Sequence, residues 1–255
     1  MIAGAVPARA RFTGRGVAVG LVDSGVNGSH PHVGGRLERS VTVLEGQGGR
    51  PLVADDLKGD VAGHGTACAG VIIQGAPDVR LFSLRVLDRQ LQTTHRRVAE
   101  AIRWCTREGM DVINLSLGTT RAEALEILET ACREAVDAGC ILVAAAGPER
   151  ERSYPAGFSG LVLGVDEDPE CGEWQCRVRP GATIPVVACG RPRDVERADL
   201  PRNFRGSSFA AARVSAMAAL LREERPGLDS GGLLETLAGP AGEGQGDDSP
   251  PAMNR

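Results

Sequence analysis

The sequence has no apolar run of 18 residues, and no basic segment followed by an apolar one stands at its start. A membrane-spanning helix needs about 20 predominantly apolar residues, so the first absence excludes a membrane span. The second absence leaves no recognisable signal peptide. We therefore expect a soluble protein that stays in the cytoplasm and has no membrane partner.

Charge of one sign is also not concentrated anywhere in the chain. The 29 Lys and Arg residues are balanced by 33 Asp and Glu residues, which gives a net charge of −4. A protein that binds nucleic acid or an anionic membrane surface typically carries a basic run or patch. We therefore expect no nucleic-acid partner, and long-range electrostatics do not identify the partner.

The seven cysteines are an odd number, and four of them lie within apolar strand or helix patterns. This usage is typical of reduced, mostly buried thiols and fits a reducing compartment. Cys171 and Cys176 lie near each other in a polar stretch, where they could pair or bind a metal, but their spacing matches no common zinc motif. We expect no metal site and no cofactor.

The 255 residues suit one large α/β domain, in which strand patterns alternate with helix patterns. Continuous apolar runs of strand length are typical of strands in a parallel sheet that is covered on both faces. We assign residues 1–238 to this domain. Residues 239–255 are dominated by Gly, Pro, Asp and Ser without periodicity, which predicts a disordered tail.

The periodicity places the individual elements. Strands are expected at residues 17–22, 79–87, 111–116, 140–146, 161–165 and 184–188. Helices are expected at residues 63–73, 94–108, 121–138, 208–224 and 231–237. Irregular structure is expected at residues 1–16, at residues 45–62 and in the polar segment around Trp174.

A helix start at Gly206-Ser207-Ser208 has the features of a turn that presents a nucleophile. Gly206 lets the backbone bend sharply, and an Ala-rich helix with one apolar stripe follows. A serine hydroxyl at such a position lies near N–H groups without intrahelical partners and near the positive end of the helix dipole, which favour developing negative charge. For this stretch alone, an ordinary serine cap on a buried helix is the alternative.

Two further polar residues stand at the ends of predicted elements. Asp23 follows the strand at 17–22, and the carboxyl ends of parallel strands are where ligands and catalytic groups gather. His64 opens the helix that begins near residue 63. Each has a structural alternative, because Asp23 could cap a turn and His64 could simply begin a helix.

The three blocks Asp23-Ser24-Gly25, Gly63-His64-Gly65-Thr66 and Gly206-Ser207-Ser208 resemble the catalytic blocks of the subtilisin-like serine peptidases (subtilases, peptidase S8), in that family's Asp, His, Ser order. The resemblance extends over residues 15–225 and implies a three-layer, subtilisin-like α/β fold with a mainly parallel sheet and helices on both faces. Further matching stretches are residues 22–31, 113–118, 144–147 and 208–214.

The resemblance implies a hydrolase with a catalytic triad. Ser208 Oγ would attack a peptide carbonyl, and His64 would take its proton and later pass it to the leaving amine. Asp23 would hold the imidazole in one tautomer and stabilise its cation. The expected partner is then a peptide or protein substrate, while the oligomeric state stays open.

The same resemblance implies two substrate-binding segments. One would be an extended segment along which a peptide pairs through main-chain hydrogen bonds, and the other would be one wall of the pocket for the side chain preceding the cut bond. Small side chains in the wall would leave room for the substrate. The segment comprises Leu115, Ser116, Leu117 and Gly118, and the wall comprises Ala144, Ala145, Ala146 and Gly147. Ordinary buried strand is the alternative, and a strand end can serve both purposes.

One position departs from the family pattern. Pro148 stands where the family normally has an Asn whose side-chain amide donates to the oxyanion, and proline has neither a side-chain donor nor a backbone N–H. In subtilisin, losing that donor costs roughly 10²–10³ in kcat. The remaining candidates for the oxyanion hole are the backbone N–H of Ser208, the hydroxyl of Ser207, and Asn203 or another loop donor.

Two main functions therefore remain open. The first is a slow, selective serine endopeptidase, for example one that removes a leader from a precursor peptide in the cytoplasm. The second is a degenerate relative that binds peptides or a protein partner without cleaving them. An unrelated doubly wound ligand-binding protein is a third interpretation, and it would leave the order of the three blocks as coincidence.

A second departure from the family pattern concerns calcium binding. Only residues 74–78 separate the helix after His64 from the next strand, which is too few for the six to eight oxygen ligands of a typical calcium site. The carboxylates of residues 55–60 or 166–168 could form an unrelated site, but solvated loop carboxylates are the simpler interpretation.

No pro-segment is visible, so either the numbering begins after processing or the protein is a compact intracellular form.

Overall fold

The computed structural model describes residues 2–5, 11–149, 152–193 and 205–239. The predicted tail is therefore described only at Gly239, and residues 240–255 lie outside the described part. Within the described residues, no helix is both long enough and apolar enough to cross a bilayer.

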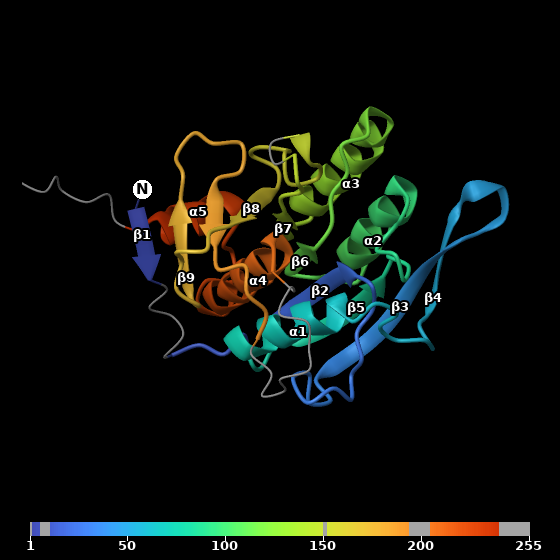
Figure 1. Ribbon diagram of the computed structural model, residues 1–255, viewed down its shortest axis with the longest axis horizontal. Coiled ribbons are helices and arrows are strands. Elements are labelled where there is room, and N and C mark those ends of the chain that lie inside the picture. Colours follow the sequence, from blue (N-terminus) through green and yellow to red (C-terminus); the bar gives the residue numbers. More distant parts are fainter. Residues whose placement is uncertain (1, 6–10, 150–151, 194–204, 240–255) are drawn as a thin grey trace, which may run out of the picture.

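The elements alternate between strands and helices through most of the chain (Figure 1). The strands are β1 (Ile2–Ala5), β2 (Ala18–Asp23), β3 (Leu37–Glu45), β4 (Pro51–Asp55), β5 (Arg80–Arg85), β6 (Val112–Leu115), β7 (Ile141–Ala145), β8 (Leu163–Glu167), β9 (Gln175–Val178) and β10 (Val186–Ala188). The helices are α1 (His64–Gly75), α2 (His95–Arg107), α3 (Leu125–Asp137), α4 (Ser207–Glu224) and α5 (Ser230–Ala238), with short 3₁₀ turns at Gln47–Gly49 and Ala122–Ala124.

Among the described residues, the strands form one ten-stranded sheet in the order β1-β9-β10-β8-β7-β6-β2-β5-β3-β4. The six central pairings, from β10–β8 across to β5–β3, are parallel, whereas β1–β9, β9–β10 and β3–β4 are antiparallel. Because β2, β6 and β7 are parallel neighbours, their carboxyl ends meet at one edge of the sheet. The fold is the mainly parallel α/β architecture that the sequence predicts.

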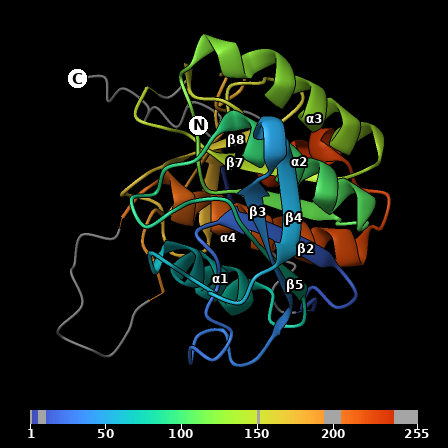
Figure 2. The same ribbon diagram turned by 90° about the vertical axis from the view of Figure 1, so that its right-hand side faces the viewer.

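Two apolar cores lie on opposite faces of the sheet. One contains the inward residues of α1, α4 and α5, and the other contains those of α2 and α3. Figure 2 shows α2 and α3 on one side of the strands and α1 on the other. The central strands are buried on both faces, which explains why β2 reads as an unbroken apolar run.

Helix α4 is buried along most of its length, and its small side chains let it approach its neighbours closely. A Cβ on Gly75 of α1 would lie 2.7 Å from Cβ of Ala216 in α4, so the two helices touch almost backbone to backbone. The hydroxyl of Ser215 donates to Oδ1 of Asn114 in β6 at 2.8 Å, and Asn114 Nδ2 donates to Ser116 Oγ at 2.7 Å. These buried bonds join the middle of α4 to the end of β6.

Three segments that were expected to be irregular contain strands. Residues 1–16 include β1, residues 45–62 include β4 together with the last residue of β3, and the segment around Trp174 includes β9. All three pair antiparallel at or near the sheet edges, where β1 binds β9 and β4 binds β3. The partner strand supplies their structure, because their own sequences lack the apolar pattern of a buried strand.

Candidate active site

Asp23 and His64 meet at the carboxyl edge of the sheet. Asp23 is the last residue of β2 and is fully buried, while His64 is the first residue of α1 and its side chain is 12% exposed. His64 Nδ1 and Asp23 Oδ1 are 2.8 Å apart, so the carboxylate holds the imidazole ring in place at its Nδ1 atom. The structure therefore brings together two of the three residues proposed for the triad.

Glycines make this approach possible. Gly25 has φ +99°, and a Cβ there would overlap the carbonyl oxygen of Gly59. A Cβ on Gly65 would overlap the carbonyl oxygen of Gly25 and lie 3.2 Å from Asp23 Cβ. The segment after β2 can therefore pack against the loop at Gly59 and against the start of α1 only because Gly25 and Gly65 lack side chains.

The pKa of His64 reflects opposing effects. Burial lowers it, but the charge of Asp23, its hydrogen bond and the charge of Asp60 together raise it above the ordinary value of 6.5. A raised pKa makes the imidazole a stronger base, because its cation is stabilised where it would form.

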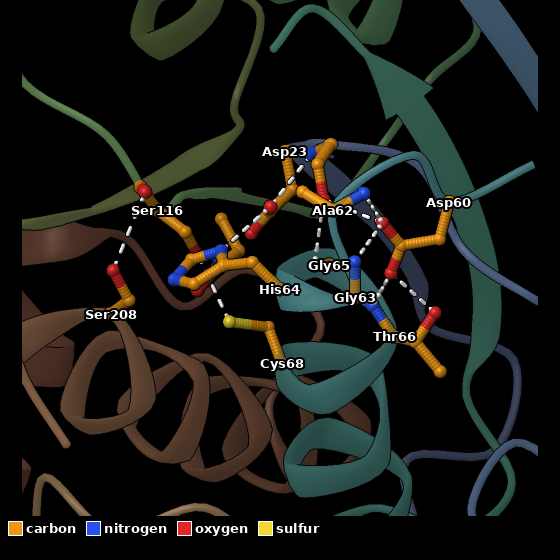
Figure 3. Close-up of polar contacts among 12 residues, drawn as sticks. Asp23, Asp60, Ala62, Gly63, His64, Gly65, Thr66, Cys68, Ser116 and Ser208 are labelled. Atoms are coloured by element: carbon orange, nitrogen blue, oxygen red, sulfur yellow. Dashed lines mark hydrogen bonds and ion pairs between the residues drawn. The ribbon is translucent and has the colours of Figure 1, made fainter. Parts of the chain in front are cut away.

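Asp60 is a residue of this site that the sequence analysis did not recognise. Its Oδ1 accepts from Ser24 Oγ at 2.7 Å, from Ala62 N–H at 3.0 Å and from Gly63 N–H at 2.8 Å. Its Oδ2 accepts from the N–H and the hydroxyl of Thr66 at 2.7 and 2.5 Å, as Figure 3 shows. It is therefore not a solvated loop carboxylate but the anchor of the first turn of α1. A carboxylate just before a helix start was the signal that could have found it.

The other acidic clusters are also paired with side chains rather than left to solvent. Asp56 accepts two hydrogen bonds from Arg85, at 3.0 and 2.9 Å, and its side chain is fully buried. Asp168 accepts from Arg177 at 2.8 Å. The interpretation as solvated loop residues is therefore wrong for Asp56 and Asp168, whereas Asp55 is 72% exposed, as that interpretation expects.

Cys68 lies beneath the imidazole and accepts a weak hydrogen bond from Ser116 Oγ at 3.6 Å. Among the described residues, Asp23, His64 and Cys68 form the one group of three potential metal ligands, with ligand atoms within 4.8 Å. Burial raises the pKa of the Cys68 thiol well above its ordinary value, which disfavours the thiolate that a metal would need. All seven cysteines are buried free thiols, including Cys171 and Cys176.

Ser208 is the second residue of α4, at the helix end whose N–H groups have no intrahelical acceptor. Its hydroxyl donates to the main-chain oxygen of Ser116 at 3.4 Å, a long bond. Figure 3 shows the ring of His64 between Asp23 and Ser208, with its second nitrogen facing the side of Ser208. Both His64 and Ser208 line one open cavity of about 570 Å³.

Three of the four residues of the predicted substrate segment line this cavity. Ser116, Leu117 and Gly118 line it, whereas Leu115 is fully buried in the sheet. Thr119 continues the segment and exchanges two main-chain hydrogen bonds with Tyr154, both of 2.8 Å. The chain beyond β6 is therefore extended, as a peptide-pairing segment requires.

The residues of the predicted pocket wall do not line this cavity. Ala144, Ala145 and Ala146 are 0–5% exposed and pack into the two cores, and Gly147 follows them. Their small side chains permit the close packing of β7.

Ser153 fills the space between the two segments. A Cβ on Gly118 or on Gly147 would overlap Ser153 Oγ, and the residue is 1% exposed. Nothing in the local sequence pattern around Ser153 indicates this position, because the contact depends on how the 152–162 loop folds back.

Few donors remain for an oxyanion. The hydroxyl of Ser207 donates to the main-chain oxygen of Ala146 at 2.5 Å, so in this structure its proton is directed away from Ser208. Pro148 is exposed just after Gly147, and its peptide bond is not among the cis bonds of the described residues. Asn203 lies outside the described residues.

Residues 14–241 match the sequence profile of the subtilase family. The chain belongs to this family. It is 28% identical over 253 residues to subtilisin DY of Bacillus licheniformis, covering 90% of this chain and 85% of that protein. It is 30% identical over 227 residues to the thermostable alkaline protease of Halalkalibacterium halodurans, covering 84% of this chain and 58% of the relative.

Two further relatives of this subtilase have similar sequence identity and coverage. Subtilisin E of Bacillus subtilis is 28% identical over 236 residues, and the alignment covers 84% of this chain and 58% of that protein. A crystal structure of a cold adapted subtilisin-like serine proteinase superposes with a TM-score of 0.67 at 25% identity, covering 88% of this chain and 82% of the other. The family and the subtilisin-like fold are thereby confirmed.

Proposed function

We propose that this subtilase is a serine endopeptidase in which Ser208, His64 and Asp23 carry the reaction. The observation on which the proposal depends is the 2.8 Å contact between His64 Nδ1 and the buried Asp23, with Ser208 lining the same cavity at the start of α4. In this proposal an acid, an imidazole and an alcohol from three distant segments would form one line for proton transfer.

The reaction would proceed in two halves. Ser208 Oγ attacks the carbonyl carbon of the peptide bond while its proton passes to the second nitrogen of His64. The imidazolium, stabilised by Asp23, gives that proton to the leaving amine as the carbon–nitrogen bond breaks. Water then attacks the acyl carbon while it loses a proton to His64. The bond from that carbon to Ser208 Oγ breaks, the imidazolium returns the proton to Oγ, and the new carboxyl end is released.

The oxyanion that forms in each half would be stabilised mainly by the N–H of Ser208 and the positive end of α4. The hydroxyl of Ser207 is engaged by Ala146, and Pro148 has no donor to offer. We therefore propose an attenuated enzyme, because a missing oxyanion donor costs roughly 10²–10³ in kcat.

Slow turnover suits selective processing rather than general digestion. We propose that the substrate is a precursor peptide whose leader is removed in the cytoplasm. The seven buried free thiols support a reducing compartment. Incubation of the purified protein with candidate precursors should give cleavage at one bond, and cleavage that persists in Ser208→Ala would contradict the proposal.

Labelling with a fluorophosphonate tests the chemistry independently of substrate. Such a probe reacts with a serine hydroxyl that a neighbouring base activates. We expect the wild-type protein to be labelled and Ser208→Ala to be unlabelled. Ser159→Ala, which removes an exposed hydroxyl outside the cavity, should be labelled like the wild type.

A second function is favoured by the arrangement around Pro148. If the oxyanion is too poorly stabilised for turnover, the cavity would still bind an extended peptide along Ser116–Gly118. The protein would then act as a peptide- or protein-binding subtilase that does not cleave. Peptide binding without labelling by the fluorophosphonate would select this alternative.

A further inference from the structure

The cavity that contains His64 and Ser208 has no acidic side chain in its wall. Among the described residues that line it, none is Asp or Glu, whereas His95 and Arg121 belong to the lining. The chain as a whole has a net charge of −4, so this distribution does not reflect a basic composition. The cavity is a local exception to the charge of the protein.

Arg121 stands where it can contact a ligand in the cavity. It follows the extended segment at residues 116–118, and its side chain is 77% exposed. Its ion-pair partner among the described residues is Glu123, which is 3.9 Å away and itself 63% exposed, so the pair is long and solvated. The N–H of Arg121 donates to Thr119 Oγ1 at 3.2 Å. The main chain is therefore held in place while the guanidinium faces solvent.

A second wall of the cavity is formed by residues 91–95, and further arginines flank this segment. Arg89 precedes it and Arg96 follows it, and both are exposed. Neither forms an ion pair with another described residue, in contrast to surface arginines such as Arg80 and Arg103. Because a guanidinium pairs well with a carboxylate, these two arginines are suited to an acidic ligand.

The acidic side chains of the same region offset only part of this charge. Residues 88–97 contain one acid, Asp88, against three arginines. Asp88 Oδ1 accepts from the N–H groups of Gln90 and Gln92, both at 2.9 Å, which holds the carboxylate against its own loop. Glu45 lines a different cavity, of about 210 Å³, between the β3–β4 hairpin and the start of α2.

The geometry gives the position of these charges along a bound peptide. The hydroxyl of Ser208 donates to the main-chain oxygen of Ser116, so the cut bond would lie beside Ser116. Arg121 comes about five residues later, after a segment that is extended as far as its bridge at Thr119. At about 3.3 Å per residue, a peptide along that segment would bring its fourth to sixth residues before the cut bond to Arg121.

We propose that the cavity selects peptides with acidic residues at about the fourth to sixth positions before the cut bond, where they pair with Arg121, Arg89 and Arg96. The substrate class is then a precursor with an acidic segment upstream of the cleavage site. The inference rests on the proposed function, because it assumes that a peptide lies along residues 116–118 with its amino-terminal part towards Arg121. Exposed charges of this kind are screened by salt, so the selectivity decreases as the ionic strength rises.

Peptides that differ only in charge test the inference. The substrates are acetylated hexapeptide p-nitroanilides with three alanines before the cleaved bond, preceded by three Glu, three Gln or three Lys residues. At low salt we expect the Glu peptide to exceed the Gln peptide roughly 5–30-fold in kcat/KM, mostly through KM, and the Lys peptide to fall below both. In 0.5 M NaCl the ratio of Glu to Gln should fall to about twofold. Equal values for Glu and Gln at low salt, or a ratio that salt leaves unchanged, would overturn the inference.

Charge reversal identifies the residues responsible. Arg121→Glu, and separately Arg89→Glu with Arg96→Glu, should each lower the preference for the Glu peptide, and the triple variant should abolish it. Arg121→Lys keeps the charge and should retain most of the preference, which distinguishes a role of the charge from damage to the fold. Arg11→Glu is the matched control, because it changes the net charge equally at an exposed site outside the cavity. A preference that survives in the triple variant, or that is lost equally in Arg11→Glu, would show that these arginines do not select the substrate.

Binding separates failure of this inference from failure of the proposed function. The three peptides, made as amides, are titrated at low salt into Ser208→Ala by calorimetry. Tighter binding of the Glu peptide without cleavage by the wild type supports the acidic selectivity and contradicts the peptidase. Cleavage without any preference for Glu overturns the selectivity and leaves the peptidase intact. Absence of both cleavage and binding in every peptide overturns the proposed function, and the selectivity with it.

Discussion

Asp60 accepts two hydrogen bonds from Thr66, one from its N–H at 2.7 Å and one from its hydroxyl at 2.5 Å. The pair joins the loop before α1 to the first turn of that helix, two residues beyond His64. The carboxylate thereby acts on the imidazole in two ways: it fixes the turn that holds the ring, and its charge helps to raise the pKa of His64.

Replacing Asp60 by Asn should shift the pH profile. A general base must be neutral, so kcat/KM rises as the pH passes through the pKa of His64, which lies above 6.5 in the wild type. Removing the charge of Asp60 lowers that pKa, so the rising limb should move to lower pH. The amide has only one acceptor oxygen, so it cannot accept all five hydrogen bonds that the two carboxylate oxygens of Asp60 accept, and the free energy of unfolding should fall by about 1–3 kcal/mol.

The pH dependence of labelling rate and the urea midpoint measure these effects. Asp55→Asn is the matched control, because that carboxylate is 72% exposed and bonded to Arg39 on the surface. An unchanged limb in Asp60→Asn would show that the carboxylate has only a structural role.

Enlarging the space beside Gly118 and Gly147 should broaden specificity. Ser153→Gly removes the hydroxyl that lies between them, so a larger side chain preceding the cut bond could enter. In Ser153→Gly, we expect the ratio of kcat/KM for a phenylalanine p-nitroanilide to that for the alanine p-nitroanilide to rise about tenfold. In Ser153→Val, we expect this ratio to fall. An equal ratio in all three proteins would place the recognition of that side chain elsewhere.

Restoring an oxyanion donor should accelerate the enzyme. Pro148→Asn supplies a side-chain amide after Gly147, and we expect kcat to rise by about 10–10³-fold with a small change in KM. Pro148→Ala removes the ring without adding a donor, so its kcat should stay near that of the wild type.

Ser207→Ala should leave kcat within about threefold of the wild-type value and lower the stability, because the hydroxyl of Ser207 is bonded to Ala146. A large loss of kcat in Ser207→Ala would instead identify it as the donor.

Chelation should leave the protein unaffected. Helix α1 ends at Gly75 and β5 begins at Arg80, so the connection is too short to wrap a cation with six or more oxygen ligands. We expect EDTA to leave the melting temperature unchanged, with addition of calcium as the reverse control. A decrease on chelation that calcium reverses would reveal a site built from other segments.

The parts of this fold that follow from local pattern were predictable. The central strands β2, β5, β6 and β7 are buried on both faces, so their apolar runs stand out in the sequence, and α2 and α3 show helical periodicity with glycine just after their ends. The edge strands β1, β4 and β9 were missed because pairing, rather than burial of both faces, makes them strands.

The sequence alone determined the identity and the order of the proposed reacting groups. Asp23, His64 and Ser208 each stand beside glycines at an element end, and those short motifs encode sharp turns and close backbone approach. Motifs of this kind can be recognised from the sequence without a structure, because they depend only on residues that are neighbours along the chain.

Tertiary structure decided what surrounds those groups. The five hydrogen bonds to Asp60, the position of Ser153 between two glycines and the engagement of Ser207 by Ala146 all join segments that meet only in the folded chain. Contacts of that kind depend on how α1, α4 and the loop after β7 pack at the sheet edge. No pattern within one segment encodes such packing, so the contacts that surround these groups can be known only from the tertiary structure.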